Sequence, residues 1–417
     1  TKLSQPPMEI NMNNSKTSNI SHLPFFADSI DLPGSANASS AKVIGERLKL
    51  ALQQDLDFFF FSPDETTSNK FDAVFQTSKR AWLSDIKDWD LPSGADGKII
   101  ELLSENVLIS CLIGHILSGK QGMIGSYEAF LNIIISQVVQ YVKFLSQSSQ
   151  VPWRKAVPAL NILSTSTCWR QDHNGFSHQS PHLISILLAN PANKANCFFP
   201  VDSISANATF DYLLNSQNVV NLTTFNKTDE PIWIDTHHAN FQLEQGASIF
   251  EFASSPDFND DGYVFTAAGD IATRESLKAL EILKTDLPGH KFRFIGITAL
   301  SHNQIGTVTA PLKSNTFDDY FGKSSHIIAN FHGYPNDLKS ILSNYTSNHR
   351  LHIHGYNERG GTTTPFEMLT KSSASRFDLC TDVARLENRP DLVEKYQNLI
   401  TVNHTHAQKL GIDLPEL

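Results

Sequence analysis

The chain has 417 residues, 40% of them hydrophobic, which is enough to bury two sizeable cores and predicts two domains. Its formal net charge of −10 argues against a nucleic-acid backbone as the main partner and leaves open a local basic pocket for a phosphorylated metabolite. Four cysteines without a paired framework indicate a reducing compartment, and no basic region followed by an apolar run opens the sequence, so we expect a cytoplasmic protein without a secretory signal.

The first part of the chain is expected to be an arm, then a helix, then a buried strand. Residues 1–41 are rich in Ser, Asn and Pro and show little periodicity, which indicates an extended linker. Residues 42–52 space their apolar side chains like a helix, and the four phenylalanines at 58–61 favour a buried strand because a proline follows closely. Residues 62–69 are predicted to form a polar turn at the carboxyl end of that strand.

Glu105 stands between a short apolar segment and a helical pattern. Apolar residues dominate 99–104, and from 107 to 115 they recur at helical spacing. Glu105 is therefore predicted to lie near the start of a helix, where the helix dipole tolerates a carboxylate and where capping is its ordinary role.

An aromatic pair and a long apolar segment follow that helix. Three glycines predict a turn before the pair: Gly119, Gly122 and Gly125. Tyr127 and Phe130 are three residues apart and would share one face of a helix, a spacing more often found in a core than at a ligand site. The segment 129–145 is interrupted by polar side chains that are costly in lipid, so we predict a buried helix and no membrane span.

Strands and helices alternate through the rest of the chain, which predicts an α/β fold with mostly parallel sheets. In the first domain the predicted strands are 159–163, 197–200 and 219–225, with a helix at 208–214. Lys227 directly follows the last of these strands and could meet a phosphate there. A second domain is expected from 231, with strands at 263–267, 292–297, 326–330 and 351–354 and a helix at 273–283. We therefore predict an arm at 1–41 and two doubly wound domains, 42–230 and 231–417.

The stretch 167–179 carries the densest chemistry in the chain. It follows a predicted strand and gathers two histidines, an acid, carboxamides and an arginine, as expected where an α/β sheet presents its ligand site. A surface turn around Asn174 and Gly175 is an equally open interpretation from these residues alone. A metal site made by Cys168, His173 and His178 has no supporting ligand spacing.

Residues 169–179 resemble the phosphoketolases, thiamine-diphosphate enzymes related to transketolase. Further landmarks of that family follow in the same order from about residue 32 to about residue 386: Pro63-Asp64-Glu65-Thr66 with Ser68-Asn69, Leu103-Ser104-Glu105, Tyr127-Glu128-Ala129-Phe130, Pro152-Trp153-Arg154, His354-Gly355-Tyr356 and Thr362-Thr363-Thr364-Pro365. Among the family's three α/β domains, the chain matches the middle, pyrimidine-binding domain and the transketolase C-terminal-like domain.

The resemblance implies a cofactor, a reaction and a partner. The expected cofactors are thiamine diphosphate and Mg²⁺, with the Mg²⁺ ligands on a diphosphate-binding domain that another chain would supply, so we expect no metal ligands here and a hetero- or homo-oligomer. The expected reaction cleaves xylulose 5-phosphate or fructose 6-phosphate with phosphate, giving acetyl phosphate and an aldose phosphate. Neither a nucleic acid nor a membrane is an expected partner.

The resemblance also assigns roles to particular residues. Glu105 matches the glutamate that activates the cofactor, and Tyr127 and Phe130 match aromatic residues that stack at the cofactor site. His173 and His178 are the expected proton-transfer groups, since imidazole works in both directions near neutral pH. The residues expected to bind substrate and phosphate are Ser68, Gln171, His173, Asn174 and Lys227.

Two departures from the family pattern keep other functions open. Ser149 stands where the family has a phosphate-binding arginine. The segment Pro200-Val201-Asp202-Ser203 departs from the Pro-Asp-Ala-Asn pattern of the family. A transketolase-like carboligase with another donor or acceptor is therefore one alternative. A non-catalytic regulatory paralogue is another, although an idle site has no physical need for a buried acid.

Overall fold

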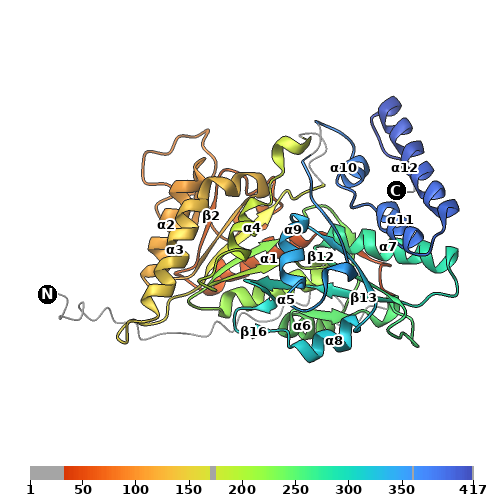
Figure 1. Cartoon of the computed structure of the whole chain (residues 1–417). Coiled ribbons are helices and arrows are strands. Elements are labelled where there is room, and N and C mark those ends of the chain that lie inside the picture. The colour runs from red at the N-terminus through yellow and green to blue at the C-terminus, as the bar shows by residue number, and fades with distance from the viewer. Residues whose placement is uncertain (1–31, 170–174, 359–360, 416–417) are drawn as a thin grey trace.

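The computed structural model describes residues 32–169, 175–358 and 361–415 (Figure 1). It contains an eleven-stranded and a five-stranded sheet, both mostly parallel, with helices packed on their faces. This arrangement confirms the predicted fold class, two doubly wound α/β layers. Most of the predicted arm lies outside the described residues, as do the predicted site residues Gln171, His173 and Asn174.

The larger sheet has the order β16-β15-β14-β8-β9-β7-β6-β2-β5-β3-β4. The run from β8 to β4 is parallel throughout, whereas β14, β15 and β16 are antiparallel. These three come from the second half of the sequence and extend the sheet beyond β8. The strand bounds are β2 Phe59–Ser62, β3 Arg80–Ala81, β4 Ser93–Gly94, β5 Ile99–Glu101, β6 Gly122–Tyr127, β7 Leu160–Thr165, β8 Ala195–Phe198, β9 Val220–Thr224, β14 Ala299–Ser301, β15 Gln304–Thr307 and β16 Ala310–Pro311.

Helices cover both faces of this sheet because its strands alternate apolar side chains toward each face. Phe60 and its neighbours face helices α1 and α5, and Phe61 with Ile124 faces α2, α3 and α4. Asp202 caps α5 and also accepts the backbone N–H groups of Trp233 and Ile234, at 2.8 and 3.1 Å. The helix bounds are α1 Ser40–Gln54, α2 Glu105–Leu117, α3 Ile135–Ser148, α4 His182–Leu188 and α5 Ser203–Asn215.

The predicted turn before Tyr127 is wrong for two of its three glycines. Gly122 and Gly125 lie within β6, a strand buried between two neighbours, and only Gly119 has the positive φ of a turn. A Cβ on Gly125 would lie 2.7 Å from Cε2 of Phe71, so the large phenylalanine rings leave space only for a hydrogen there. The glycines therefore mark close packing in a central strand.

The segment predicted as a buried helix is a 3₁₀ helix, η2 (Glu128–Ile134), followed by α3. Only one face of α3 is buried, through Val138, Tyr141, Val142 and Leu145, so the prediction was too strong. Within the described residues, the stretch Glu128–Ser148 is long and apolar enough to cross a membrane, but core helices of soluble proteins can have the same length and composition.

The second sheet has the order β11-β13-β12-β17-β18, parallel except for β11. Helices α7, α11 and α12 cover one face and α8 and α9 the other; Figure 1 shows α11 and α12 at the opposite end of the molecule from α2 and α3. The remaining bounds are β1 Asn37–Ala38, β10 Glu230–Pro231, α6 Thr236–Gln245, β11 Ala247–Ile249, β12 Tyr263–Ala268, α7 Asp270–Asp286, β13 Phe292–Ile297, α8 Ser314–Phe321, β17 His326–Phe331, α9 Pro335–Leu342, β18 Leu351–Gly355, α10 Pro365–Lys371, α11 Arg376–Leu386 and α12 Pro390–Leu410.

Candidate active site

Tyr127 is the centre of a polar and aromatic cluster at the carboxyl ends of the parallel strands. It is the last residue of β6, and its hydroxyl donates to Oγ of Ser68 over 2.8 Å. Its ring stacks on that of Phe130, with centroids 5.8 Å apart and planes 12° apart. The two residues therefore share a face as predicted, but a strand end and a 3₁₀ turn bring them together, and not one helix.

Lys227 and His178 complete this cluster from two other segments. Nζ of Lys227 lies 4.8 Å from the centroid of the Tyr127 ring, a cation–π distance. His178 ends the 3₁₀ helix Gly175–His178, and its ring packs edge-on against Phe130 with centroids 5.7 Å apart. The structure thus brings together Ser68, Tyr127, Phe130, His178 and Lys227, five predicted site residues from four distant parts of the sequence.

Glu105 begins α2 beside this cluster and is buried, with 7% of its surface exposed. Ser104 occupies the N-cap position, so Glu105 is not itself the capping residue. Among the described residues no donor is bonded to the Glu105 carboxylate, although it lies near enough to Glu65 to repel its charge. The helix α2 that Glu105 begins contacts η2, the turn that carries Phe130. A buried carboxylate without a protein partner is an arrangement that a ligand with a hydrogen-bonding ring would satisfy.

Glu65 belongs to this cluster, although the sequence analysis gave it no role. It was quoted as a family landmark without a role, yet its Oε2 accepts the backbone N–H of Tyr127 over 3.0 Å. Burial raises the pKa of Glu65 to about 7, helped by the negative charge of Glu105 and opposed by Lys227. Burial lowers the pKa of Lys227, and the negative charge of Glu65 offsets only part of that effect. The signal in the sequence was an acid in a polar turn directly after a buried strand.

Glu65→Gln is expected to make the protein's stability less dependent on pH. A carboxyl group whose folded pKa is raised from 4.5 to about 7 contributes fully below pH 4.5 and loses that contribution as pH rises through 7. The variant should therefore exceed the wild type in free energy of unfolding by about 1–3 kcal/mol at pH 8 and not at pH 4. Urea titrations at both pH values measure this difference. Asp64→Asn, at the exposed neighbouring carboxylate, is the control, and an equal effect of both variants would contradict the assignment to Glu65.

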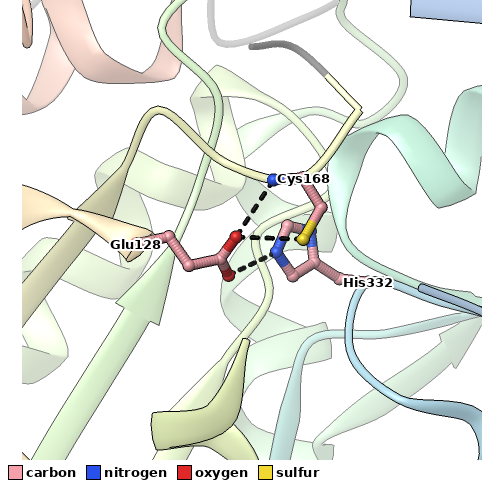
Figure 2. Close-up of side chains that lie close together, drawn as sticks. All are labelled: Glu128, Cys168 and His332. Carbon is pink, nitrogen blue, oxygen red and sulfur yellow. Dashed lines mark hydrogen bonds and ion pairs between the residues drawn. The ribbon is translucent and has the colours of Figure 1, made fainter. Parts of the chain in front are cut away.

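Near the cluster, Glu128 links the two halves of the sequence through a fully buried polar network (Figure 2). One carboxylate oxygen accepts the backbone N–H and the thiol of Cys168, at 3.0 and 3.1 Å, and the other accepts Nε2 of His332 at 2.7 Å. Burial alone would lower the pKa of His332, but the Glu128 charge outweighs it and raises that pKa. Burial and the same charge raise the pKa of the Cys168 thiol.

Within the described ranges, these residues form the only group of three or more metal-ligating side chains whose ligand atoms lie close enough together to hold one ion. The group includes Cys168 but not His178, so the metal site considered from sequence is not assembled in that form; His173 lies outside the described residues. Both carboxylate oxygens of Glu128 already accept hydrogen bonds, one from Cys168 and the other from His332. We therefore assign the group to positioning: it fixes Cys168 at the point where the chain enters the stretch 170–174.

Further buried polar atoms surround the strand ends and suit a polar ligand. Within the described ranges, several hydroxyls have no hydrogen-bond partner: Thr66 Oγ1, Ser126 Oγ, Ser166 Oγ and Thr167 Oγ1. They follow or end β2, β6 and β7, which are neighbours in the sheet. Because unpaired buried hydroxyls are costly, these atoms together with Glu105 and the Tyr127–Phe130 stack fit a bound heterocycle such as the pyrimidine of thiamine diphosphate.

Comparisons with known proteins identify the family of the chain. Residues 42–216 match the family model described as D-xylulose 5-phosphate/D-fructose 6-phosphate phosphoketolase, and residues 227–417 match the model of its C-terminal domain. A probable phosphoketolase of Rhodopseudomonas palustris is 33% identical over 94% of this chain and 51% of its own length, and one of Thermosynechococcus vestitus is 34% identical over 93% and 49%. The chain thus spans about half the length of these relatives.

Solved structures show the same fold at low sequence identity. Transketolase from Leishmania mexicana superposes with a TM-score of 0.64 at 12% identity, over 88% of this chain and 47% of that one. A chain described as a split-gene transketolase, an inactive beta4 tetramer, superposes with a TM-score of 0.55 at 14% identity, over 83% of this chain and 97% of that one. With both family models matched in order along the sequence, the chain belongs to the phosphoketolase family of transketolase-like proteins.

Proposed function

We propose that this chain is the pyrimidine-binding half of a thiamine-diphosphate-dependent phosphoketolase. The reaction would cleave xylulose 5-phosphate or fructose 6-phosphate with inorganic phosphate to acetyl phosphate, an aldose phosphate and water. The observation that carries the proposal is the buried Glu105 carboxylate, whose charge reaches Glu65, the residue that accepts the N–H of Tyr127. Membership of the phosphoketolase family supports it.

The residues of this chain divide the work by their chemistry. Thiamine diphosphate, when bound, supplies a carbanion that attacks a ketose carbonyl. Glu105 would hold the proton exchanged with the pyrimidine ring, and the aromatic stack would orient that ring and exclude water. His178, beside Phe130, and His173 would carry protons to and from the substrate hydroxyls.

The phosphate groups require donors and cations. Lys227 and Ser68 both adjoin the Tyr127 ring, and the carboxamides of Gln171 and Asn174 would add donors. Ser149, where the family pattern has arginine, ends α3, and Arg154 lies over the Phe144 ring, 4.5 Å from its centroid. Phosphate binding in this chain would therefore depend more strongly on Lys227.

The proposed partner is a chain that carries a diphosphate-binding module with the Mg²⁺ ligands. Support comes from the apolar side chains that surround Glu105 at the surface: Leu103 is 80% exposed, Leu102 47% and Val107 44%. Exposed leucines gathered around a buried acid are typical of a surface that another protein covers. The likeness to one chain of a split-gene transketolase supports a two-chain arrangement of this fold.

Reconstitution tests the proposal directly. Mixing the chain with a diphosphate-binding module of a phosphoketolase, thiamine diphosphate and Mg²⁺ should give acetyl phosphate from xylulose 5-phosphate, measured as its hydroxamate. Product analysis also separates the carboligase alternative, which the serine at position 149 motivates. Acetyl phosphate formed without an aldehyde acceptor would reject the carboligase, whereas ketose products that require an acceptor would reject the phosphoketolase.

Leu103→Asp is expected to prevent this assembly while leaving the chain folded. A charge placed at the centre of an apolar contact must be desolvated without a partner, so binding of the module should weaken at least about a hundredfold. Analytical ultracentrifugation of the mixture measures it. Leu410→Asp, which alters a residue 57% exposed at the far end of α12, is the matched control. Equal binding by both variants would place the interface elsewhere.

A further inference from the structure

Two histidines from neighbouring parallel strands lie side by side near the edge of the five-stranded sheet. His326 begins β17, and His352 lies in β18, the edge strand, opposite Ile328. Nδ1 of His326 and Nε2 of His352 are 3.1 Å apart, a hydrogen bond in which the tautomers decide which ring donates, and both side chains are half-buried. We propose that this pair is a two-imidazole binding site for a borderline divalent transition metal of the Zn²⁺ class.

The spacing of the two nitrogens suits one ion. Imidazole nitrogens bound to Zn²⁺ at about 2.0–2.1 Å stand about 3–3.4 Å from each other, and the observed separation lies in that range. Each neutral ring can carry its single proton on the nitrogen that faces away, Nε2 of His326 and Nδ1 of His352, so both lone pairs converge without any net release of protons. Imidazole ligands favour Zn²⁺, Ni²⁺ and Cu²⁺ over the hard ions Mg²⁺ and Ca²⁺.

Two carboxylates lie near the pair, and each is already engaged with another side chain: Asp382 accepts from Nε2 of His354 at 2.8 Å, and Glu387 pairs with His290 at 3.0 Å. Glu387, at the end of α11, and Asp382, in the same helix, are the carboxylates whose fields reach His326 and His352 respectively. Opposing positive charge comes from Arg350 and, where protonated, from His349 and His354. Arg350 is directed away, because its guanidinium donates to the backbone carbonyls of Phe321, Gly322 and Ser325.

The pair also remains reachable and in the right protonation state. Because β18 is an edge strand, solvent can approach and can supply the remaining ligands of the ion. Burial lowers the pKa of both histidines, which keeps the rings neutral near pH 7. By contrast, the Glu128, Cys168 and His332 group is fully buried, so solvent cannot supply further ligands there.

Calorimetric titration of the purified chain with Zn²⁺, Ni²⁺ and Mg²⁺ tests the site. The wild type is expected to bind one equivalent of Zn²⁺ or Ni²⁺ and no Mg²⁺, and either His326→Asn or His352→Asn should weaken that binding at least about tenfold. His237→Asn, an exposed histidine on α6, is the matched control and should bind like the wild type. Circular dichroism confirms that each variant is folded.

Three outcomes would overturn the site. The first is a wild type that binds neither Zn²⁺ nor Ni²⁺, and the second is a folded double variant that binds as the wild type does. The third comes from X-ray absorption of the Zn²⁺-loaded chain. Only nitrogen and oxygen ligands are expected, so a sulfur ligand would assign the ion to the group that contains Cys168.

Discussion

Glu105→Gln is expected to lower the turnover of the reconstituted enzyme roughly 10²–10⁴-fold, the range that a positioned acid or base contributes. The amide keeps the size and the hydrogen-bonding reach of the side chain but cannot exchange a proton with the pyrimidine ring. Because Glu105 is at the start of α2 and Ser104 occupies the cap, the substitution should leave the helix intact. Formation of acetyl phosphate under saturating cofactor measures the loss.

Cofactor binding separates lost chemistry from lost structure. The variant should still bind thiamine diphosphate in the presence of the partner module, followed by quenching of protein fluorescence. Glu394→Gln, at an exposed site on α12, is the control for removing one carboxylate and should keep wild-type turnover. Turnover of Glu105→Gln within a factor of about three of the control would refute the proposed proton transfer.

Glu275→Gln is expected to destabilise the chain by about 3–5 kcal/mol, because it breaks a buried ion-pair network from the middle. Glu275 is fully buried in α7 and accepts bonds from Arg274 at 3.0 and 3.1 Å and from Arg376 at 2.8 Å. Burial alone would raise the pKa of Glu275, but these two arginines lower it to about 2. Removing the charge would take the Glu275 carboxylate from both guanidinium groups, although Arg274 would keep its pairing with Glu230 at 2.8 Å.

Urea unfolding at pH 7 measures this effect, and Glu281→Gln is the control. Glu281 pairs with Lys278 over 2.9 Å at the surface, with its side chain 63% exposed, so its loss should cost less than about 1 kcal/mol. The pH profile gives a second check. A carboxyl group whose pKa is lowered from 4.5 to about 2 stabilises the fold above pH 4.5 and loses that contribution as pH falls toward 2, so the two curves should converge in acid.

The fold class and several strand positions were predictable because they depend on local periodicity, whereas the helix predicted at 208–214 begins at Ser203 and strands β14 to β16 were not predicted. The strands predicted at 263–267 and 292–297 match β12 and β13 to within one residue. The same reasoning failed at Gly122 and Gly125, because a glycine that makes room for a distant ring looks like a turn when read locally. The deciding contact is that of Phe71 with Gly125, which arises from tertiary packing. The residues around β6 in the sequence do not indicate it.

The candidate site was predictable only as far as the family resemblance and the strand-end rule reached. Both pointed to Glu105, Tyr127 and Lys227, and the structure places Lys227 against Tyr127. Neither pointed to Glu128 as a link to His332, since those residues are 204 positions apart and their pairing depends on how the two domains dock. Buried polar networks of this kind are specified by three-dimensional contacts, so a single sequence does not reveal them.

The antiparallel strands β14, β15 and β16 make the two halves of the chain mutually dependent. They belong by sequence to the second half, yet β14 forms a ladder with β8, from Ala299 opposite Phe198 to Ser301 opposite Asn196. Cutting the chain at residue 230 would strip β8 of that neighbour and expose its unpaired amide and carbonyl groups, a surface that promotes aggregation. Separate production of the halves is thus a poor way to study either, and thermal melting should proceed as one cooperative event.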